Sequence, residues 1–325
     1  MPEIVGLGPT SAELFDGSIV RLFGLEPDTV YEVNGVTFRT LPDIGTVSSR
    51  VCTMNDVHLG ETECGKFGGG PAQFVSLPGE RPYPTVMNES AASDALSLEP
   101  DLVVVRGDLT DSGEPEQYEE FLRIYRGTFG DSLLHVRGNH DGYTGREFAN
   151  WPVQSVDIPG LRIVLIDTAR PRTSGGSIDN QQIEEVLALV RSASTPSMLM
   201  GHHPLDVPGA GLPADGVNAE DAERFIEAIA MEKSVVGYSA GHTHRCHFYN
   251  YRGVPLIEVA SVKDFPGAFA EYQVGSRGIS QTVRRASSPE ALVWSERTRG
   301  MFDGFYETYA LGSLEARGFV LPLER

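Results

Sequence analysis

Short apolar runs alternate with helical patterns along the chain from residue 51 onward. The clearest run, 101–107 (DLVVVRG), is continuous and rich in valine, which is typical of a parallel strand buried on both faces. Runs of the same kind occupy residues 51–54, 133–138, 161–167, 197–201 and 234–241. Helical patterns lie between them at residues 113–127, 179–190 and 218–230. This alternation predicts an α/β fold with a largely parallel sheet.

Residues 1–45 do not follow this alternation, and we expect them to form a small β appendage. Residues 31–38 (YEVNGVTF) carry Asn34-Gly35 between two strand-like runs, which predicts a β-hairpin with a type I′ turn. The segment resembles the late strands of a fibronectin-type sandwich, although it has about half the length that such a sandwich needs. We expect residues 46–325 to form the main domain, with a C-terminal extension from about residue 261.

A long loop interrupts the main domain between residues 61 and 84. It is rich in glycine and proline, and loops of this length are uncommon inside compact domains. We therefore expect this loop to be either a functional lid or a mobile segment.

The net charge limits the partners that the chain can have. With 45 acidic and 26 basic residues among 325, the formal net charge is −19, which argues against a nucleic-acid polymer as substrate or partner. No run approaches ~18 consecutive apolar residues, so we expect no membrane-spanning helix and no membrane partner. The three cysteines, Cys52, Cys64 and Cys246, do not suit a disulfide framework. Together with an N-terminus that lacks a secretory signal pattern, they favour a cytoplasmic location.

Polar side chains that can bind metals follow five of the apolar runs. In chain order they are Asp56 and His58, Asp108 and Asp111, Asn139, His140 and Asp141, His202 and His203, and His242 and His244. Because ligands bind at the carboxyl ends of strands in open α/β sheets, all of these residues can meet at one edge. Each motif alone is also explained by a turn or a helix cap. Burying so many uncompensated polar groups is costly, so a shared metal site explains them better together.

Three histidines lie within residues 241–248 (GHTHRCHF). Histidine is the commonest metal ligand, and Gly241 permits a bend of the chain at this point. Taken alone, the stretch does not decide between a metal site and a solvated turn. His247 lies beyond the motif, and we expect it to be an ordinary strand histidine.

In this order and at these spacings, the motifs resemble the signature of the calcineurin-like metallophosphoesterase family, over about residues 50–260. The resemblance implies a four-layer αββα sandwich that holds two metal ions. The implied ligands of one metal are Asp56, His58, Asp108 and His244. The implied ligands of the other are Asp108, Asn139, His202 and His242, so that Asp108 bridges the two ions. The choice of His202 over His203 rests on the resemblance alone.

The implied chemistry agrees with these residue types. Carboxylate and imidazole ligands suit divalent or trivalent Mn, Fe or Zn. Two such ions ~3.5–4 Å apart would hold a hydroxide and clamp a phosphoryl group for in-line attack. The resemblance places His140 near the phosphate, where it would stabilise charge or protonate the leaving oxygen. We expect Asp141 to orient His140, and Asp111 to support the site without binding a metal.

The same motifs are similar to the class III cyclic-nucleotide phosphodiesterase group of bacteria, which includes glycerophosphodiesterase-like members. This resemblance implies a metal-dependent phosphodiesterase whose substrate is a small phosphoester such as a 3′,5′-cyclic nucleotide. The β appendage, the 61–84 loop and the C-terminal extension depart from that group and leave the substrate open. A phosphomonoesterase and a non-catalytic metal-binding scaffold of the same fold remain alternatives. The sequence also leaves open whether the protein forms a homodimer.

Overall fold

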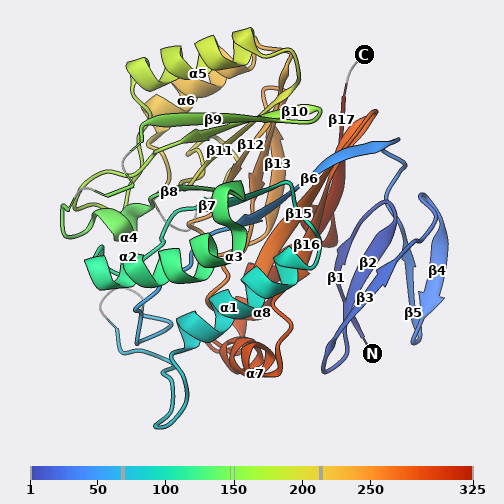
Figure 1. Cartoon of the computed structure of the whole chain (residues 1–325), viewed down its shortest axis with the longest axis vertical. Coiled ribbons are helices and arrows are strands. Elements are labelled where there is room, and N and C mark those ends of the chain that lie inside the picture. Colours follow the sequence, from blue (N-terminus) through green and yellow to red (C-terminus); the bar gives the residue numbers. More distant parts are fainter. Residues whose placement is uncertain (1, 67–69, 147, 150, 212–214, 324–325) are drawn as a thin grey trace.

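Two mixed β-sheets of six strands each lie face to face in the computed structural model, which describes residues 2–66, 70–146, 148–149, 151–211 and 215–323 (Figure 1). The strand order of the first sheet is β17 (Gly318–Pro322), β16 (Gly278–Arg285), β15 (Ala268–Gly275), β6 (Val47–Met54), β7 (Leu102–Arg106) and β8 (Leu133–Val136). The order of the second sheet is β13 (His247–Tyr251), β14 (Val254–Glu258), β12 (Val235–Ala240), β11 (Ser197–Gly201), β10 (Leu161–Ile166) and β9 (Val153–Ile158).

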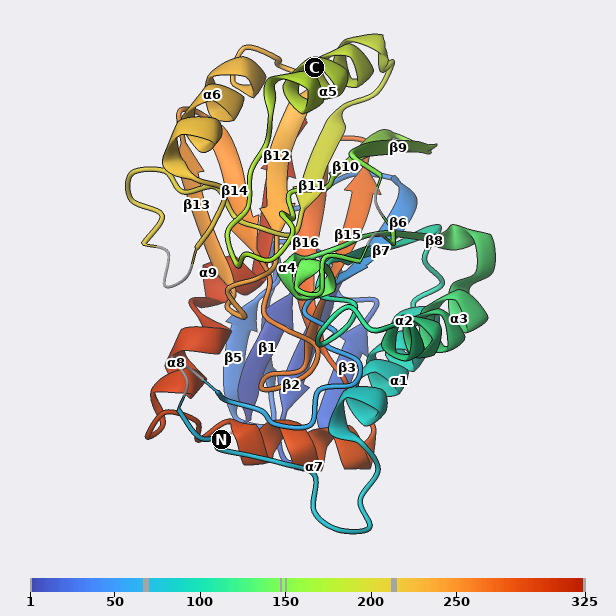
Figure 2. The same ribbon diagram turned by 90° about the vertical axis from the view of Figure 1, so that its left-hand side faces the viewer.

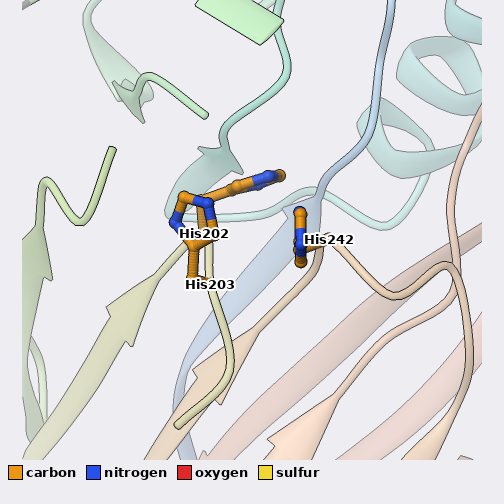
Figure 3. Close-up of side chains that lie close together, drawn as sticks. All are labelled: His202, His203 and His242. Atoms are coloured by element: carbon orange, nitrogen blue, oxygen red, sulfur yellow. The ribbon is translucent and has the colours of Figure 1, made fainter. Parts of the chain in front are cut away.

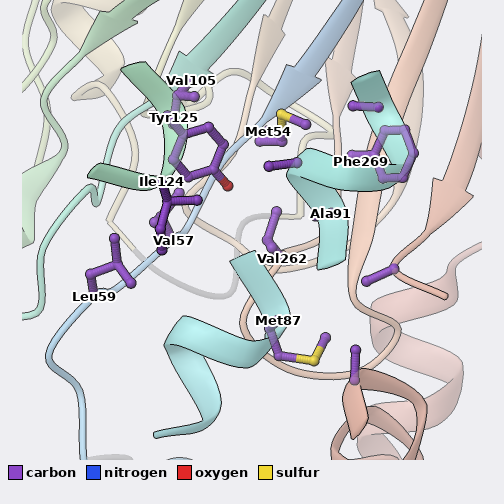
Figure 4. Packing of buried hydrophobic residues seen from close by; sticks show 14 of the residues in the cluster. Met54, Val57, Leu59, Met87, Ala91, Val105, Ile124, Tyr125, Val262 and Phe269 are labelled. Carbon is purple, nitrogen blue, oxygen red and sulfur yellow. The ribbon is translucent and has the colours of Figure 1, made fainter. Parts of the chain in front are cut away.

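Helices cover the outer face of each sheet and complete a four-layer αββα sandwich (Figure 1, Figure 2). The second sheet is covered by α5 (Asn180–Ser192) and α6 (Ala219–Ile229). The first sheet is covered by α1 (Tyr83–Leu96), α2 (Pro115–Phe121), the π-helix Leu122–Arg126, α3 (Gly127–Phe129), α7 (Pro289–Thr298) and α8 (Phe305–Leu311). Met87 and Ala91 of α1 belong to the same buried cluster as Met54 and Phe269 of the sheet (Figure 4). The predicted fold class is confirmed.

The continuous apolar strands are explained by burial on both faces. In β7, Leu102 and Val104 belong to the core between the two sheets. Val103 and Val105 of the same strand pack against the helices on the other side. Because successive side chains of a strand point to opposite faces, a strand with apolar layers on both sides has no solvent-facing position.

The two sheets are mixed rather than largely parallel, which corrects the expectation from the strand–helix alternation. Strands β6, β7 and β8 are mutually parallel, as are β10, β11, β12 and β14. Strands β9, β13, β15, β16 and β17 pair antiparallel with their neighbours. Direct hairpin connections give three of these antiparallel pairs, β9 with β10, β13 with β14 and β15 with β16, whereas β15 with β6 and β16 with β17 pair across long connections.

The predicted helices form where the capping residues indicate. Asp179 caps α5, and its side chain accepts a hydrogen bond from the Gln182 backbone N–H, as in a capping box. Asn218 caps α6 in the same way by accepting from the backbone of Asp221. The third helical segment begins with Pro115 in its first turn but widens into the π-helix after residue 121. No helix among the described residues is long and apolar enough to cross a membrane.

The N-terminal residues form a separate small sheet and a hairpin. The three-stranded sheet consists of β1 (Glu3–Leu7), β2 (Ser11–Phe15) and β3 (Ile19–Phe23). The predicted hairpin is confirmed as β4 (Val30–Val33) and β5 (Val36–Arg39), with positive φ angles at both Asn34 and Gly35. The domain boundary near residue 45 and the fibronectin-like character stay predictions.

The chain beyond residue 261 is built into the main fold. It supplies β15, β16 and β17 to the first sheet and α7 and α8 to its covering layer, while α9 (Leu314–Arg317) precedes β17. In the 61–84 loop, Cys64 pairs through its backbone with Phe74, and residues 67–69 lie outside the described residues. The lid function of this loop stays a prediction.

Candidate metal centre

Each polar motif follows directly on the carboxyl end of a β-strand. Asp56 follows β6, Asp108 follows β7, and Asn139 begins the short helix α4 (Asn139–Gly142) after β8. His202 follows β11, and His242 follows β12. Figure 3 shows the imidazoles of His202, His203 and His242 close together where these two strands end. The sheet topology therefore brings motifs from both sheets to one place.

All seven predicted ligands lie close to at least one other predicted ligand. The sets with ligand atoms within 4.8 Å of each other include Asp56, His58 and His244; Asp56, Asp108 and His202; His58, Asp108 and His140; and His202, His203 and His242. Asn139 joins them, because its Oδ1 lies 3.0 Å from His202 Nε2. Asp108 lies centrally, with Oδ2 at 3.4 Å from His58 Nε2 and 3.3 Å from His202 Nε2. The structure thus brings together all the residues that the sequence nominated as metal ligands.

The backbone is strained at most of these positions. Asp56, His58, Asp108, His242 and His244 all have φ angles between 47° and 69°. Non-glycine residues rarely adopt this left-handed conformation, and strained residues cluster at functional sites. His242 and His244 are therefore part of a sharp turn after β12, in agreement with a bend beside Gly241.

Two of the buried imidazoles have ring nitrogens without a hydrogen-bond partner in the part of the chain that the structure describes. Both ring nitrogens of His58 and Nε2 of His242 are buried and have no hydrogen-bond partner among the described residues. Burial lowers the pKa of His58 well below its usual value and lowers the pKa of His242 to about 3. Both rings are neutral at pH 7, so each offers an unshared electron pair. Unpaired buried polar atoms are costly, and a cation would compensate for them.

The Asp108 carboxylate is ionised and lies among the site imidazoles. Although burial opposes ionisation, the neighbouring histidines hold the pKa of Asp108 well below its usual value. Burial likewise lowers the pKa of His202, but the Asp108 charge outweighs it and raises that pKa to about 9. A position that attracts a proton so strongly also attracts a metal cation.

His202 and His203 differ in what their rings contact. His202 Nδ1 donates to the carbonyl oxygen of Arg106 at 2.9 Å, which directs Nε2 toward Asp108. His203 has both ring nitrogens engaged, with Nδ1 2.8 Å from Thr168 Oγ1 and Nε2 3.1 Å from the carbonyl oxygen of Ser174. These contacts favour His202 as the ligand of the two.

Asn139 and Asp56 are oriented by residues that the sequence analysis missed. Asn139 Nδ2 donates to Tyr143 Oη at 2.7 Å, which leaves its amide oxygen toward His202. Asn55 Nδ2 donates to Asp56 Oδ2 at 2.6 Å, and the buried Arg106 donates to Asn55 Oδ1 at 2.6 Å. Asn55 could have been noticed because it is adjacent to Asp56 in the sequence. Arg106 could not, because a single polar residue at the end of a strand carries no functional signal.

Asp111 and Asp141 do not have the roles that we expected. His140 Nδ1 donates to the main-chain carbonyl of Asp111 at 2.6 Å, so Asp111, rather than Asp141, orients this ring. The Asp141 carboxylate instead accepts from the backbone N–H groups of Leu109, Thr110 and Gly138. Burial and the Asp108 charge raise the pKa of Asp141 to about 6. Asp141 therefore joins the loops after β7 and β8, and the expectation that it contacts His140 is wrong.

The comparison with known proteins identifies the family. The model of the calcineurin-like phosphoesterase family matches residues 49–246, which is more than half of the chain. The chain therefore belongs to the calcineurin-like phosphoesterase family, a family of phosphoester hydrolases, and the resemblance noted in the sequence is confirmed.

Relatives of this chain carry names of phosphodiesterases. A probable cyclic nucleotide phosphodiesterase of Synechococcus sp. is 32% identical over 48% of this chain and 62% of its own length. A cAMP/cGMP dual specificity phosphodiesterase of Mycobacterium tuberculosis is 30% identical over 56% of this chain and 60% of its own. A glycerophosphodiester phosphodiesterase of Enterobacter lignolyticus is 25% identical over 53% of this chain and 66% of its own. The chain thus spans only 60% to 62% of the first two relatives.

A solved structure supports the fold. The crystal structure of a dimetal phosphatase from Danio rerio aligns with a TM-score of 0.57 at 14% identity, and covers 75% of this chain and 98% of the other. At this identity the likeness concerns the fold alone.

Proposed function

We propose that the protein is a metal-dependent phosphodiesterase with two metal ions, acting on a small phosphodiester. The observation that carries the proposal is the meeting of carboxylate, amide and imidazole ligands around Asp108, among them buried imidazole nitrogens without a protein partner. A scaffold that binds no metal would need only the fold. It would not need neutral histidines held in strained backbone at the edge where ligands bind. A metal-binding scaffold is distinguished by the turnover test below.

The proposed ligands divide into two sets that share Asp108. Asp56, His58, Asp108 and His244 would hold one cation, and Asp108, Asn139, His202 and His242 would hold the other. The donor set of carboxylate and imidazole groups fits Mn, Fe or Zn ions. Bound there, two such cations supply Lewis acidity and neutralise the charge of a phosphoryl group.

His140 is our candidate for the proton donor. Its Nδ1 must carry a hydrogen, because the Asp111 carbonyl that it contacts can only accept. Nε2 is therefore the nitrogen left to hold a proton for the leaving oxygen. The His140 ring packs edge-on against the His58 ring with 4.3 Å between centroids. His140 therefore lies beside the proposed metal ligands.

Two substrate classes follow from the named relatives. The Synechococcus and Mycobacterium relatives favour a 3′,5′-cyclic nucleotide, and the Enterobacter relative favours a glycerophosphodiester. Both are small diesters, which a chain of net charge −19 binds more readily than a nucleic-acid polymer.

The test uses purified protein loaded with Mn²⁺ and four substrates: cyclic AMP, glycerophosphoethanolamine, bis(p-nitrophenyl) phosphate and p-nitrophenyl phosphate. We expect turnover of the diesters, and loss of both turnover and bound metal in Asp108→Asn. The matched control is Asp131→Asn, because Asp131 is an exposed carboxylate outside the site. Faster turnover of the monoester would indicate a phosphomonoesterase. Metal binding without turnover of any of the four would indicate a scaffold and refute the proposal.

A further inference from the structure

The two nitrogens of the His244 imidazole face two different carboxylates. Nε2 lies 3.5 Å from Asp56 Oδ1, on the side of the proposed metal ligands. Nδ1 lies 3.4 Å from Asp264 Oδ2, on the opposite side of the ring. For comparison, Nδ1 of His202 faces the main-chain carbonyl of Arg106. His244 is thus backed by a full negative charge where His202 is backed by a neutral oxygen.

Asp264 is itself held in place by buried hydrogen bonds. It is 2% exposed, and its Oδ1 accepts from the Tyr306 hydroxyl at 2.8 Å and from the Ser261 hydroxyl. Tyr306 is also buried, and its oxygen lies 3.5 Å from His244 Nδ1. With Oδ1 occupied by two donors, Oδ2 faces the imidazole and also accepts a weak hydrogen bond from the Cys64 thiol at 3.9 Å. Lys263 Nζ lies 4.0 Å from Asp264 Oδ2 and pairs with Glu61.

These groups come from the part of the chain beyond the family match. The family model ends at residue 246, whereas Asp264 lies in the segment between β14 and β15 and Tyr306 lies in the first turn of α8. The helices α7 and α8 pack on the first sheet through Trp294 and Tyr306, which belong to its outer core. The C-terminal region therefore contacts the proposed metal centre as well as completing the sheet.

We propose that Asp264, held by Tyr306, is a positioning residue that orients His244 and strengthens its binding of a cation. The proposal rests on the metal centre proposed above. A carboxylate that accepts the Nδ1–H bond keeps the hydrogen on Nδ1 and leaves the electron pair on Nε2, which faces Asp56. It also makes the ring more basic. Outer partners of this kind typically change metal affinity 10–100-fold.

The experiment measures metal binding rather than activity. Metal-free wild type, Asp264→Asn and Tyr306→Phe are dialysed against graded free Mn²⁺, and bound metal per chain is counted. We expect two ions in the wild type, and in Asp264→Asn a roughly 10–100-fold weaker affinity for one ion only, with a smaller change in Tyr306→Phe. The electron paramagnetic resonance signature of a coupled manganese pair should weaken in parallel, which a purely structural role of Asp264 would not produce.

Matched controls separate positioning from general destabilisation. Asp94→Asn removes a buried carboxylate that contacts Arg21 and Ser287, and Tyr125→Phe removes a buried hydroxyl that donates to Asn88. Both should bind two ions with wild-type affinity.

Each outcome decides the proposal. A folded Asp264→Asn protein that binds both ions as tightly as the wild type would overturn the positioning role alone. A wild type that binds no cation would overturn the metal centre and the positioning role with it. If Asp264→Asn does not fold, Tyr306→Phe decides. Unchanged affinity for both ions in that variant overturns the role that we give to Tyr306 and Asp264, and selective weakening of one ion supports it.

Discussion

Gly138 provides a steric test of the proposed site. It lies between β8 and α4 with φ −109° and ψ −169°, a conformation that alanine also adopts, so Gly138→Ala introduces no strain of the φ angle. The new Cβ, however, would lie 2.3 Å from Asp108 Oδ1, 2.4 Å from the Asp108 backbone nitrogen and 2.8 Å from His202 Nε2. The substitution therefore acts directly on two proposed ligands.

The size of the effect follows from these distances. Ordinary contacts of a Cβ begin near 3.4 Å, so Asp108 must retreat by about 1 Å. Its backbone nitrogen cannot do so without moving the loop after β7. Overpacking of this kind costs about 1–3 kcal/mol of stability. A displacement of about 1 Å in a catalytic geometry can reduce turnover about 100-fold.

The assay compares Gly138→Ala with Gly127→Ala in bound Mn²⁺ per chain, in turnover of bis(p-nitrophenyl) phosphate and in melting temperature. Gly127 is helical, and a Cβ there meets nothing within 4 Å. We expect Gly127→Ala to behave like the wild type, with unchanged or slightly higher stability. Wild-type metal content and turnover in Gly138→Ala would refute the reasoning. That result would show that metal binding and catalysis do not depend on the positions of Asp108 and His202.

Three further predictions concern stability. Burial lowers the pKa of His135 to about 4, so the folded state resists a protonation that the unfolded chain accepts near pH 6.5. Stability is therefore lost as pH falls from about 6.5 to about 4, by about 3 kcal/mol in total. Urea unfolding at pH 7 and pH 5 should show a larger loss for the wild type than for His135→Gln, and equal losses would contradict this. Phe225 is fully buried beneath the second sheet, so Phe225→Ala should lower the unfolding free energy by about 3–5 kcal/mol without changing turnover per folded molecule. A loss below about 1 kcal/mol in urea unfolding would show that α6 packs differently. Mn²⁺ at 100 times its Kd should stabilise the metal-free protein by about 2.7 kcal/mol for each ion that binds only the folded state. A melting temperature that does not respond to Mn²⁺ would argue against the metal centre.

Local pattern indicated many of the elements and nominated the polar residues after the strands, and the family resemblance selected the proposed ligands among them. A strand buried on both faces must be apolar throughout, and this made β7, β10 and β11 visible as continuous runs. The polar residues after the strands stand out because their type and their place relative to the strand ends are both local properties. The caps Asp179 and Asn218 were predictable for the same reason, since each bonds to the backbone three residues ahead.

Long-range contacts decided the sheet arrangement and the supporting contacts of the site, which the local sequence pattern does not specify. The alternation of strands and helices does not say how many sheets form, and in the structure the strands β9–β14 form one mixed sheet while β6–β8 and β15–β17 form the other. The roles of Asp111 and Asp141 could not be separated from sequence, because both residues follow strands. Only the packing of the two loops brings the main-chain carbonyl of Asp111 to His140 and the Asp141 carboxylate to the backbone of Thr110. Asp264 and Tyr306 carry no sequence signal at all. They reach His244 from 20 and 62 residues away, and a hydrogen bond across such a separation exists only after the sheets and helices have packed.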